Sequence, residues 1–150
     1  MFVVNSDFSI AADDAEFSLP NVHQGTAPVQ EVLSLTNSML RTPVLRLALL
    51  GKYEHWTAER ARQLGLIFET YPKDAIADRI DELVDILNNK SSPLCVRGAK
   101  AGYWGTIDVP YSLAGKLDHI YKAEVRAASE DSKEGPRAFA EKRRPQWKAR

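Results

Sequence analysis

The sequence predicts an α/β chain in which a few short strands come first and a predominantly helical region follows. Residues 2–19 alternate between apolar and polar side chains, which is the period of a strand. From about residue 30 onward, apolar residues recur at intervals of three and four, which places them on one face of a helix. With 150 residues, 44% of them hydrophobic, and no segment that looks like a linker, the chain has the size of one globular domain.

Three short strands are expected in the first half of the chain. Residues 8–10 and 17–19 each place apolar side chains at alternate positions, and Asp13 and Asp14 between them favour a turn. A third strand is expected at residues 67–69. Three short strands cannot form a sheet with a covered face and protected edges, so we expect the remaining strands to come from elsewhere.

The helices of the first half have clear sequence boundaries. Two short helices are expected between residues 30 and 51, because Thr42-Pro43 interrupts the apolar pattern there. Thr57 is a suitable N-cap for the next helix. Gly65 stands where the end of that helix requires a positive φ.

The second half is expected to be almost wholly helical. Pro72 can begin a helix whose apolar positions, the last of them Leu87, recur at intervals of three and four. Further helices are expected over about residues 93–104, after Pro110, and over about residues 130–143.

Composition excludes several classes of partner and site. Twenty basic and twenty acidic residues give no net charge, so no global field attracts nucleic acid or an anionic membrane surface. A single cysteine, Cys95, excludes an intrachain disulfide, and with three scattered histidines it argues against a metal site. No stretch reaches the roughly 18 apolar residues of a membrane span, and the N-terminus does not resemble a signal peptide. A cytoplasmic protein with no membrane association is therefore expected.

Four segments carry a resemblance to a known family. They are SDFSIAADDAEFSLPNV at 6–22, LALLGKYEHWTAERARQLGLI at 47–67, NKSSPLCVRGAKAGYWG at 89–105 and SEDSKEGPRAFAEKRRPQWKAR at 129–150. In this order and spacing they resemble the C-terminal portion of the enoyl-CoA hydratase/isomerase (crotonase) superfamily, over nearly the whole chain. Each segment alone is a weak match, whereas the four in register are specific.

The resemblance implies a fold and an assembly. Residues 1–70 would be the incomplete end of the crotonase ββα spiral. Residues 71–150 would be a helical region for trimerisation and for contact with coenzyme A. The implied partners are an acyl-CoA substrate and further copies of the chain, in a trimer or hexamer. No separate cofactor is implied, because coenzyme A enters as part of the thioester substrate.

The resemblance also points to two candidate catalytic residues. Hydratases of this family use two glutamates to position and activate water. The first would align with Met1, and Asn21 occupies the position of the second. An amide can orient water but cannot take its proton. The stretch after Gly25 departs from the usual family pattern, but a subset of crotonase-like sequences places a glutamate near this point, so the resemblance makes Glu31 the candidate substitute carboxylate. The alternative for Glu31 is an exposed acid in the first turn of a helix. His23, beside Asn21, is expected to be structural or exposed.

Two residues near the C-terminus match family positions that contact the coenzyme A nucleotide. Lys142 would attract its phosphates, and Phe139 would offer an aromatic face to its adenine. The alternative is that Lys142 belongs to a solubilising basic tail and that Phe139 only packs. A kink or restart of the helix near Pro136 would change the direction in which Lys142 points.

Three functions remain open at this stage. The first is the hydration of 2-enoyl-CoA. In the family this needs two backbone amides that polarise the thioester carbonyl, which would lie before Met1, so the chain alone is expected to be inactive. The second is a non-catalytic remnant or oligomerisation module. The third is a crotonase-fold isomerase, decarboxylase or hydrolase with a different acid/base set.

Overall fold

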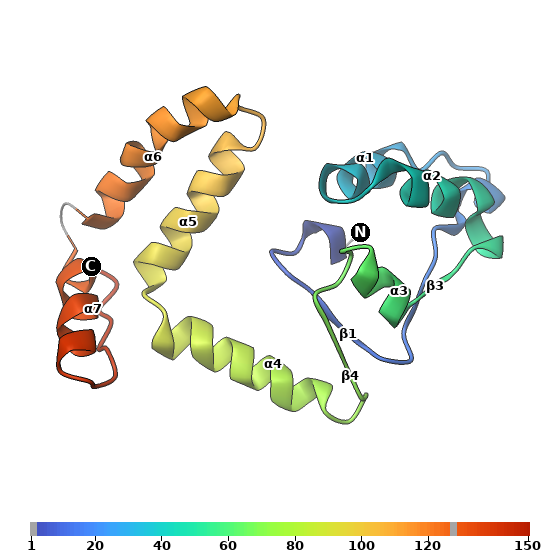
Figure 1. Cartoon of the computed structure of the whole chain (residues 1–150). Helices are drawn as coiled ribbons and strands as arrows, with labels where there is room; N and C mark the ends of the chain where they lie inside the picture. Colours follow the sequence, from blue (N-terminus) through green and yellow to red (C-terminus); the bar gives the residue numbers. More distant parts are fainter. Residues whose placement is uncertain (1–2, 127–128) are drawn as a thin grey trace. The chain divides into compact units, whose positions relative to one another are not determined.

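A computed structural model describes residues 3–126 and 129–150 and confirms the predicted fold class (Figure 1). Helices make up 62% of the chain and strands 7%. The chain forms two compact units, Met1–Asp78 and Arg79–Arg150. The assignment of residues 1–70 to the end of the spiral, and of residues 71–150 to trimerisation and coenzyme A contact, stays a prediction.

The first unit contains the strands, several short helical segments and the start of α4. Its elements in order are η1 (Val3–Asn5), β1 (Ile10–Ala12), β2 (Glu16–Phe17), η2 (Pro20–Gln24), α1 (Val29–Ser38), α2 (Arg41–Leu50), η3 (Gly51–Tyr53), β3 (Trp56–Thr57), α3 (Ala58–Gln63) and β4 (Glu69–Tyr71). The second unit contains most of α4 (Ile76–Asp85), then η4 (Ile86–Lys90), α5 (Pro93–Thr106), α6 (Tyr111–Arg126) and α7 (Asp131–Ala140).

The described strands form two separate pairs. β1 lies parallel to β4, with Ile10 opposite Glu69, and β2 lies antiparallel to β3, with Phe17 opposite Trp56. β1 and β4 each lie about two residues later than predicted. Each pair has only two strands, and isolated pairs of this kind are marginally stable in water.

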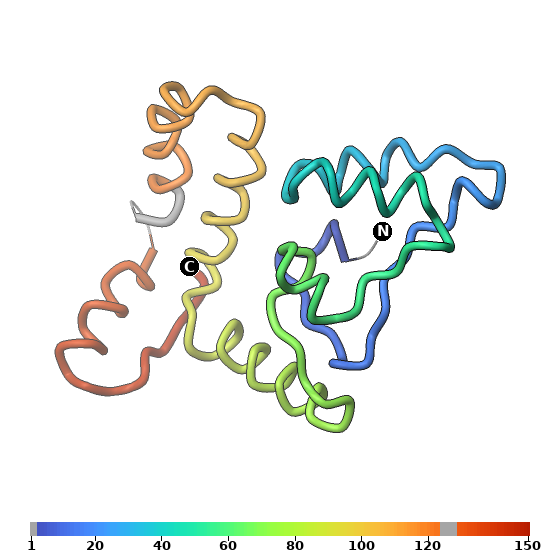
Figure 2. The backbone as a smooth tube through the Cα atoms, turned by 45° about the vertical axis from the view of Figure 1, so that its right-hand side comes forward, coloured from blue at the N-terminus to red at the C-terminus, as the bar shows by residue number. Residues whose placement is uncertain are grey.

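The first unit nevertheless has a well-buried apolar core. α1 and α2 run side by side in both backbone views and supply three of its seven buried side chains (Figure 2). The buried side chains are Leu35, Val44, Leu47, Trp56, Ala58, Ala61 and Ile67. Partly buried residues of β1, β2 and the start of η2 pack against this cluster. The core therefore ties the segment that carries Asn21 to the helices behind it.

Both boundaries predicted for α3 are confirmed, whereas the break between α1 and α2 lies at Met39 and Leu40 and the predicted breaker, Thr42-Pro43, falls in the first turn of α2. The Thr57 hydroxyl accepts a hydrogen bond from the Arg60 amide at 3.2 Å, which caps α3. Gly65 has φ +82°, and the next amide, of Leu66, returns to the Ala61 carbonyl at 2.9 Å. This bonding satisfies carbonyls that the end of a helix leaves free.

Helix α4 begins later than predicted. The chain turns at Pro72, where the Ala75 amide donates to the Pro72 carbonyl at 2.9 Å, and the helix starts at Ile76. The prediction that Pro72 begins the helix was therefore wrong, because the residues from Pro72 to Ala75 are needed to turn the chain out of β4.

The second unit buries few apolar side chains. α5 and α6 pack against each other as a helical hairpin in which Gly102 and Gly105 face Tyr121. Among the side chains that the structure describes in this unit, only Ala138 is a buried apolar residue. Large apolar side chains of α4, η4, α5 and α6 stay exposed, among them Ile80, Val84, Leu87, Trp104, Leu113 and Ile120. An exposed apolar surface of this kind is typical of a contact with another protein.

Helix α7 ends at Ala140, three residues before the predicted end. Lys142 adopts φ +53°, and the Arg143 amide reaches back to the Ala138 carbonyl at 3.0 Å. This turn reverses the chain. Pro136 lies inside a continuous α7, so the helix does not restart there.

Candidate functional site

The backbone around Asn21 is held by three hydrogen bonds to one carbonyl. η2 begins at Pro20 and ends at Gly25, which has φ +75°. The Asn21 carbonyl accepts the amide of Gly25 and both the amide and the hydroxyl of Thr26, the last two at 3.1 and 3.2 Å. Asn21 is thereby fixed at the start of a tight turn that leads to α1.

Glu31 comes from the first turn of α1 and lies against Asn21. The Asn21 amide nitrogen Nδ2 donates to Glu31 Oε1 at 3.4 Å, a long hydrogen bond, and both side chains are half-buried. The structure therefore brings the two predicted catalytic residues together. Glu31 is not a fully exposed acid, although its place in the first helical turn also suits a negative side chain. The catalytic role of the pair stays a prediction.

His23, expected to be structural or exposed, is exposed and also packs against η3. Its ring meets Tyr53 edge to face, with ring centroids 5.0 Å apart, and lies directly over the backbone of Gly51. The Lys52 ammonium lies 5.1 Å from the centroid of the Tyr53 ring. Sequence spacing could not reveal these contacts, because they join η2 to η3 through the fold.

Phe139 and Lys142 lie at the C-terminal end of α7 and just beyond it. Phe139 is 88% exposed. Packing against other described residues therefore does not explain why an aromatic side chain stands there. The structure gives Lys142 no hydrogen bond or ion pair with any described side chain. Arg143 and Lys148 differ, since both form ion pairs with glutamates. These contacts distinguish Lys142 from a uniformly basic tail, and coenzyme A binding stays a prediction.

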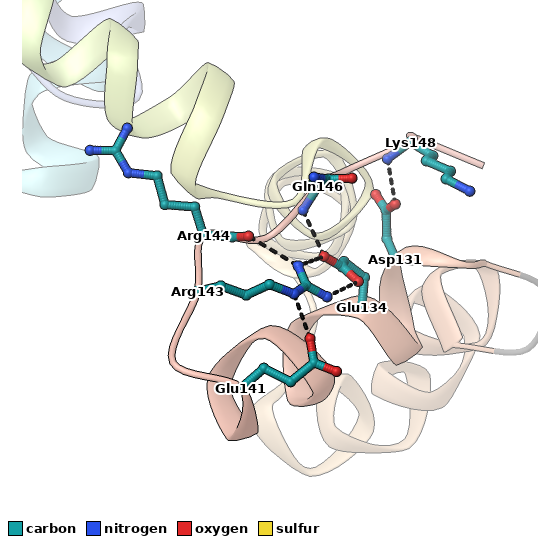
Figure 3. Close-up of polar contacts among 7 residues, drawn as sticks. All are labelled: Asp131, Glu134, Glu141, Arg143, Arg144, Gln146 and Lys148. Carbon is teal, nitrogen blue, oxygen red and sulfur yellow. Dashed lines mark hydrogen bonds and ion pairs between the residues drawn. The ribbon is translucent and has the colours of Figure 1, made fainter.

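A set of contacts that we call the C-terminal clasp holds residues 143–150 against α7 (Figure 3). Glu134 accepts two hydrogen bonds from the Arg143 guanidinium, at 2.5 and 3.0 Å, and one from the Gln146 amide at 2.7 Å. Asp131 is only 3% exposed and accepts the Lys148 amide at 2.7 Å. It also accepts the Ala149 amide and the Ser92 hydroxyl, both at 3.2 Å. These carboxylates tie the returning segment to α7, and Asp131 ties α7 to the start of α5.

The contacts of Glu134 in the C-terminal clasp predict how the stability of the fold depends on pH in acid. Hydrogen bonds from Arg143, and next from the Gln146 amide, lower the pKa of Glu134 from 4.5 to about 2. Since the pKa is lower in the folded protein, the clasp stabilises the fold fully above pH 4.5 and loses this effect as the pH falls through about 2. The difference in urea midpoint between wild type and Glu134→Gln should therefore be constant near neutral pH and shrink below pH 4.5. A difference that stays constant down to about pH 3 would contradict this.

The described part of the chain contains neither a metal site nor a membrane-spanning helix. No three His, Cys, Asp or Glu side chains gather there in a way that could hold a metal ion. None of the described helices combines the length and the apolar character that crossing a bilayer requires.

Comparison with known proteins decides the family. The sequence profile of the enoyl-CoA hydratase/isomerase family matches residues 1–150. The chain belongs to this family. A solved enoyl-CoA hydratase/isomerase from Mycobacterium paratuberculosis superposes with a TM-score of 0.94 at 38% identity, over 99% of this chain and 58% of that one. An enoyl-CoA hydratase from Mycobacterium tuberculosis H37Rv superposes with a TM-score of 0.87 at 28% identity, over 97% of this chain and 56% of that one.

The curated relatives are longer than this chain. A carnitinyl-CoA dehydratase from Citrobacter koseri is 35% identical over 152 aligned positions, which cover 97% of this chain and 56% of the relative. The chain thus spans just over half the length of the relatives it matches. This agrees with the predicted C-terminal portion of the crotonase fold.

Proposed function

We propose that this enoyl-CoA hydratase/isomerase chain supplies part of the active site of a hydratase that adds water across the 2,3 double bond of an enoyl-CoA. The observation that carries the proposal is the contact between Asn21 and Glu31. Asn21 lies in the segment 6–22 that resembles the family, and Glu31 lies nine residues beyond the end of that segment. The dehydratase relatives add support, because dehydration of a 3-hydroxyacyl thioester is the reverse of the proposed addition.

The pair offers the two roles that water addition needs. Glu31 would take a proton from water as the water oxygen bonds to C3, and it would then give that proton to C2, which completes the addition and leaves Glu31 ionised again. The Asn21 amide would orient the water and the carboxylate. The backbone amides that polarise the thioester carbonyl would come from a part of the fold outside this chain.

The coenzyme would be recognised by the turn after α7. Lys142 presents an ammonium that no described carboxylate neutralises, which suits a phosphate. Phe139 presents an exposed ring, which suits stacking on adenine.

An isomerase is the second candidate, and one observation favours it. Asn21 replaces one of the two carboxylates of the hydratase pattern, which leaves Glu31 as the acid of the pair. A single carboxylate is enough to take a proton from one carbon of an enoyl thioester and return it to another. This reaction needs no water.

We also propose a homo-oligomer, a trimer or hexamer, located in the cytoplasm. The exposed apolar side chains of α4, α5 and α6 support the assembly, because a second copy would remove them from water. The exposed thiol of Cys95 suits a reducing compartment.

Turnover of crotonyl-CoA tests the proposed function. The loss of enoyl thioester absorbance is followed for the 150-residue chain and for a fusion that places the preceding part of the Citrobacter koseri relative before Met1. We expect the fusion to hydrate crotonyl-CoA. A folded fusion that binds crotonyl-CoA but does not exceed the background rate would favour the non-catalytic alternative. A fusion that only shifts the double bond of a 3-enoyl-CoA would favour the isomerase.

A further inference from the structure

Lys142 occupies a backbone position that lysine does not favour. Its φ is +53°, and helices usually place glycine at the left-handed residue after their last turn. A residue with a side chain keeps such a conformation when its surroundings impose it, and such positions are frequent at ligand contacts. The contacts of the neighbouring residues therefore determine how the Lys142 ammonium is presented.

Arg143 is the residue that imposes this geometry. Its amide closes the turn onto the Ala138 carbonyl, and its guanidinium is held by both carboxylate oxygens of Glu134. The Glu134 carboxylate is only 13% exposed and also accepts the Gln146 amide, so it is fixed on α7 by more than one bond. Figure 3 shows this carboxylate between the Arg143 guanidinium and the Gln146 amide.

We propose that Glu134 is a positioning residue for coenzyme A binding. By holding the guanidinium of Arg143, it fixes the turn that presents Lys142 to the nucleotide of the acyl-CoA, next to Phe139 at the end of α7. The inference rests on the proposed function, because it takes these two side chains as the coenzyme contacts. Glu134 itself would not touch the coenzyme, and its negative charge would repel the coenzyme phosphates.

The sign of that charge makes the inference testable. Coenzyme A is a polyanion, so removal of a nearby negative charge should by itself strengthen binding. A positioning role predicts the opposite, since the turn loses the pair that preorganises it. Glu130 provides a matched control, because it is an exposed glutamate directly before α7 that pairs only with the side chains of Lys148 and Arg150.

The experiment measures the dissociation constant of crotonyl-CoA by calorimetry on the full 150-residue chain at low salt. We expect Glu134→Gln to weaken binding about 3- to 10-fold, which is the effect of losing one preorganising charged pair. Lys142→Ala should weaken binding by a similar factor, with a greater loss at low salt. Glu130→Gln should leave binding unchanged or strengthen it slightly.

A double-mutant cycle separates positioning from general destabilisation. If Glu134 acts through Lys142, Glu134→Gln should have little further effect in a Lys142→Ala background. Effects that multiply would overturn the inference.

Arg143→Lys is a second variant in case Glu134→Gln does not fold. Lysine keeps the positive charge but lacks the planar guanidinium that binds both carboxylate oxygens of Glu134. This variant should also weaken binding.

The remaining outcomes distinguish this inference from the proposed function. If Lys142→Ala weakens binding while Glu134→Gln behaves like Glu130→Gln, the coenzyme contact stands and the positioning role is wrong. If Lys142→Ala has no effect, or if the unmodified chain does not bind crotonyl-CoA, both the contact and the positioning role are wrong.

Discussion

Replacement of Glu31 by glutamine is expected to lower the rate of crotonyl-CoA hydration by about 10²- to 10⁴-fold, the range for loss of a general acid or base. Glutamine keeps the size of the side chain and can still contact Asn21, so the loss should come from the missing proton acceptor. The measurement is kcat and KM for the fusion with the Citrobacter koseri segment. A fall in kcat with little change in KM is the expected pattern, since Glu31 would act on the reacting atoms.

Glu16→Gln is the control for this substitution. Glu16 lies on β2 in the same compact unit and is exposed, so the variant undergoes the same chemical change without touching the proposed pair. It should retain the unmodified rate. If Glu31→Gln also keeps the unmodified rate while the fusion turns over substrate, Glu31 is an ordinary acid of the first helical turn, and the base lies elsewhere.

Local chemistry determined which parts of the fold could be predicted. The cap at Thr57 and the positive φ at Gly65 each depend on one or two residues, and both were predicted. The division into two helices was also predicted, but the break was placed at Thr42-Pro43, which lies in the first turn of α2, where proline is tolerated. The start of α4 was misplaced, because a proline at the first position of a helix and a proline in the turn before it look alike in sequence.

Long-range contacts account for what could not be predicted in the candidate sites. The resemblance identified Asn21 and Glu31 but not their contact, which depends on the turn at Gly25. The roles of Asp131 and Glu134 left no sequence signal, because their partners lie nine or more positions away along the chain, and all but Ser92 lie beyond a chain reversal. The amphipathic pattern of α4 predicted its helix correctly but could not show that its apolar face stays exposed in this chain.

Gly51→Ala is expected to be the most destabilising substitution in the first unit. Gly51 is buried and has φ +54° and ψ −121°, a conformation that residues with a side chain rarely adopt. A Cβ there would collide with the His23 ring and would lie 2.9 Å from Val22 Cγ2. Backbone strain of about 1–3 kcal/mol and crowding of about 1–3 kcal/mol predict a loss of about 2–6 kcal/mol in the free energy of unfolding. Urea unfolding of the chain measures this loss.

Two further variants separate the causes of the Gly51→Ala effect. Gly65 also has a positive φ, +82°, but a Cβ there would meet nothing within 4 Å, so Gly65→Ala should cost only about 1–2 kcal/mol. His23→Ala makes room beside Gly51, and in that background Gly51→Ala should cost less than in the unmodified chain. Equal costs in both backgrounds would show that the ring does not crowd Gly51.

The Gly51→Ala substitution should also affect activity. Because His23 and Asn21 share η2, displacement of the His23 ring should move Asn21 away from Glu31. The folded fraction of Gly51→Ala should therefore turn over crotonyl-CoA more slowly in the fusion.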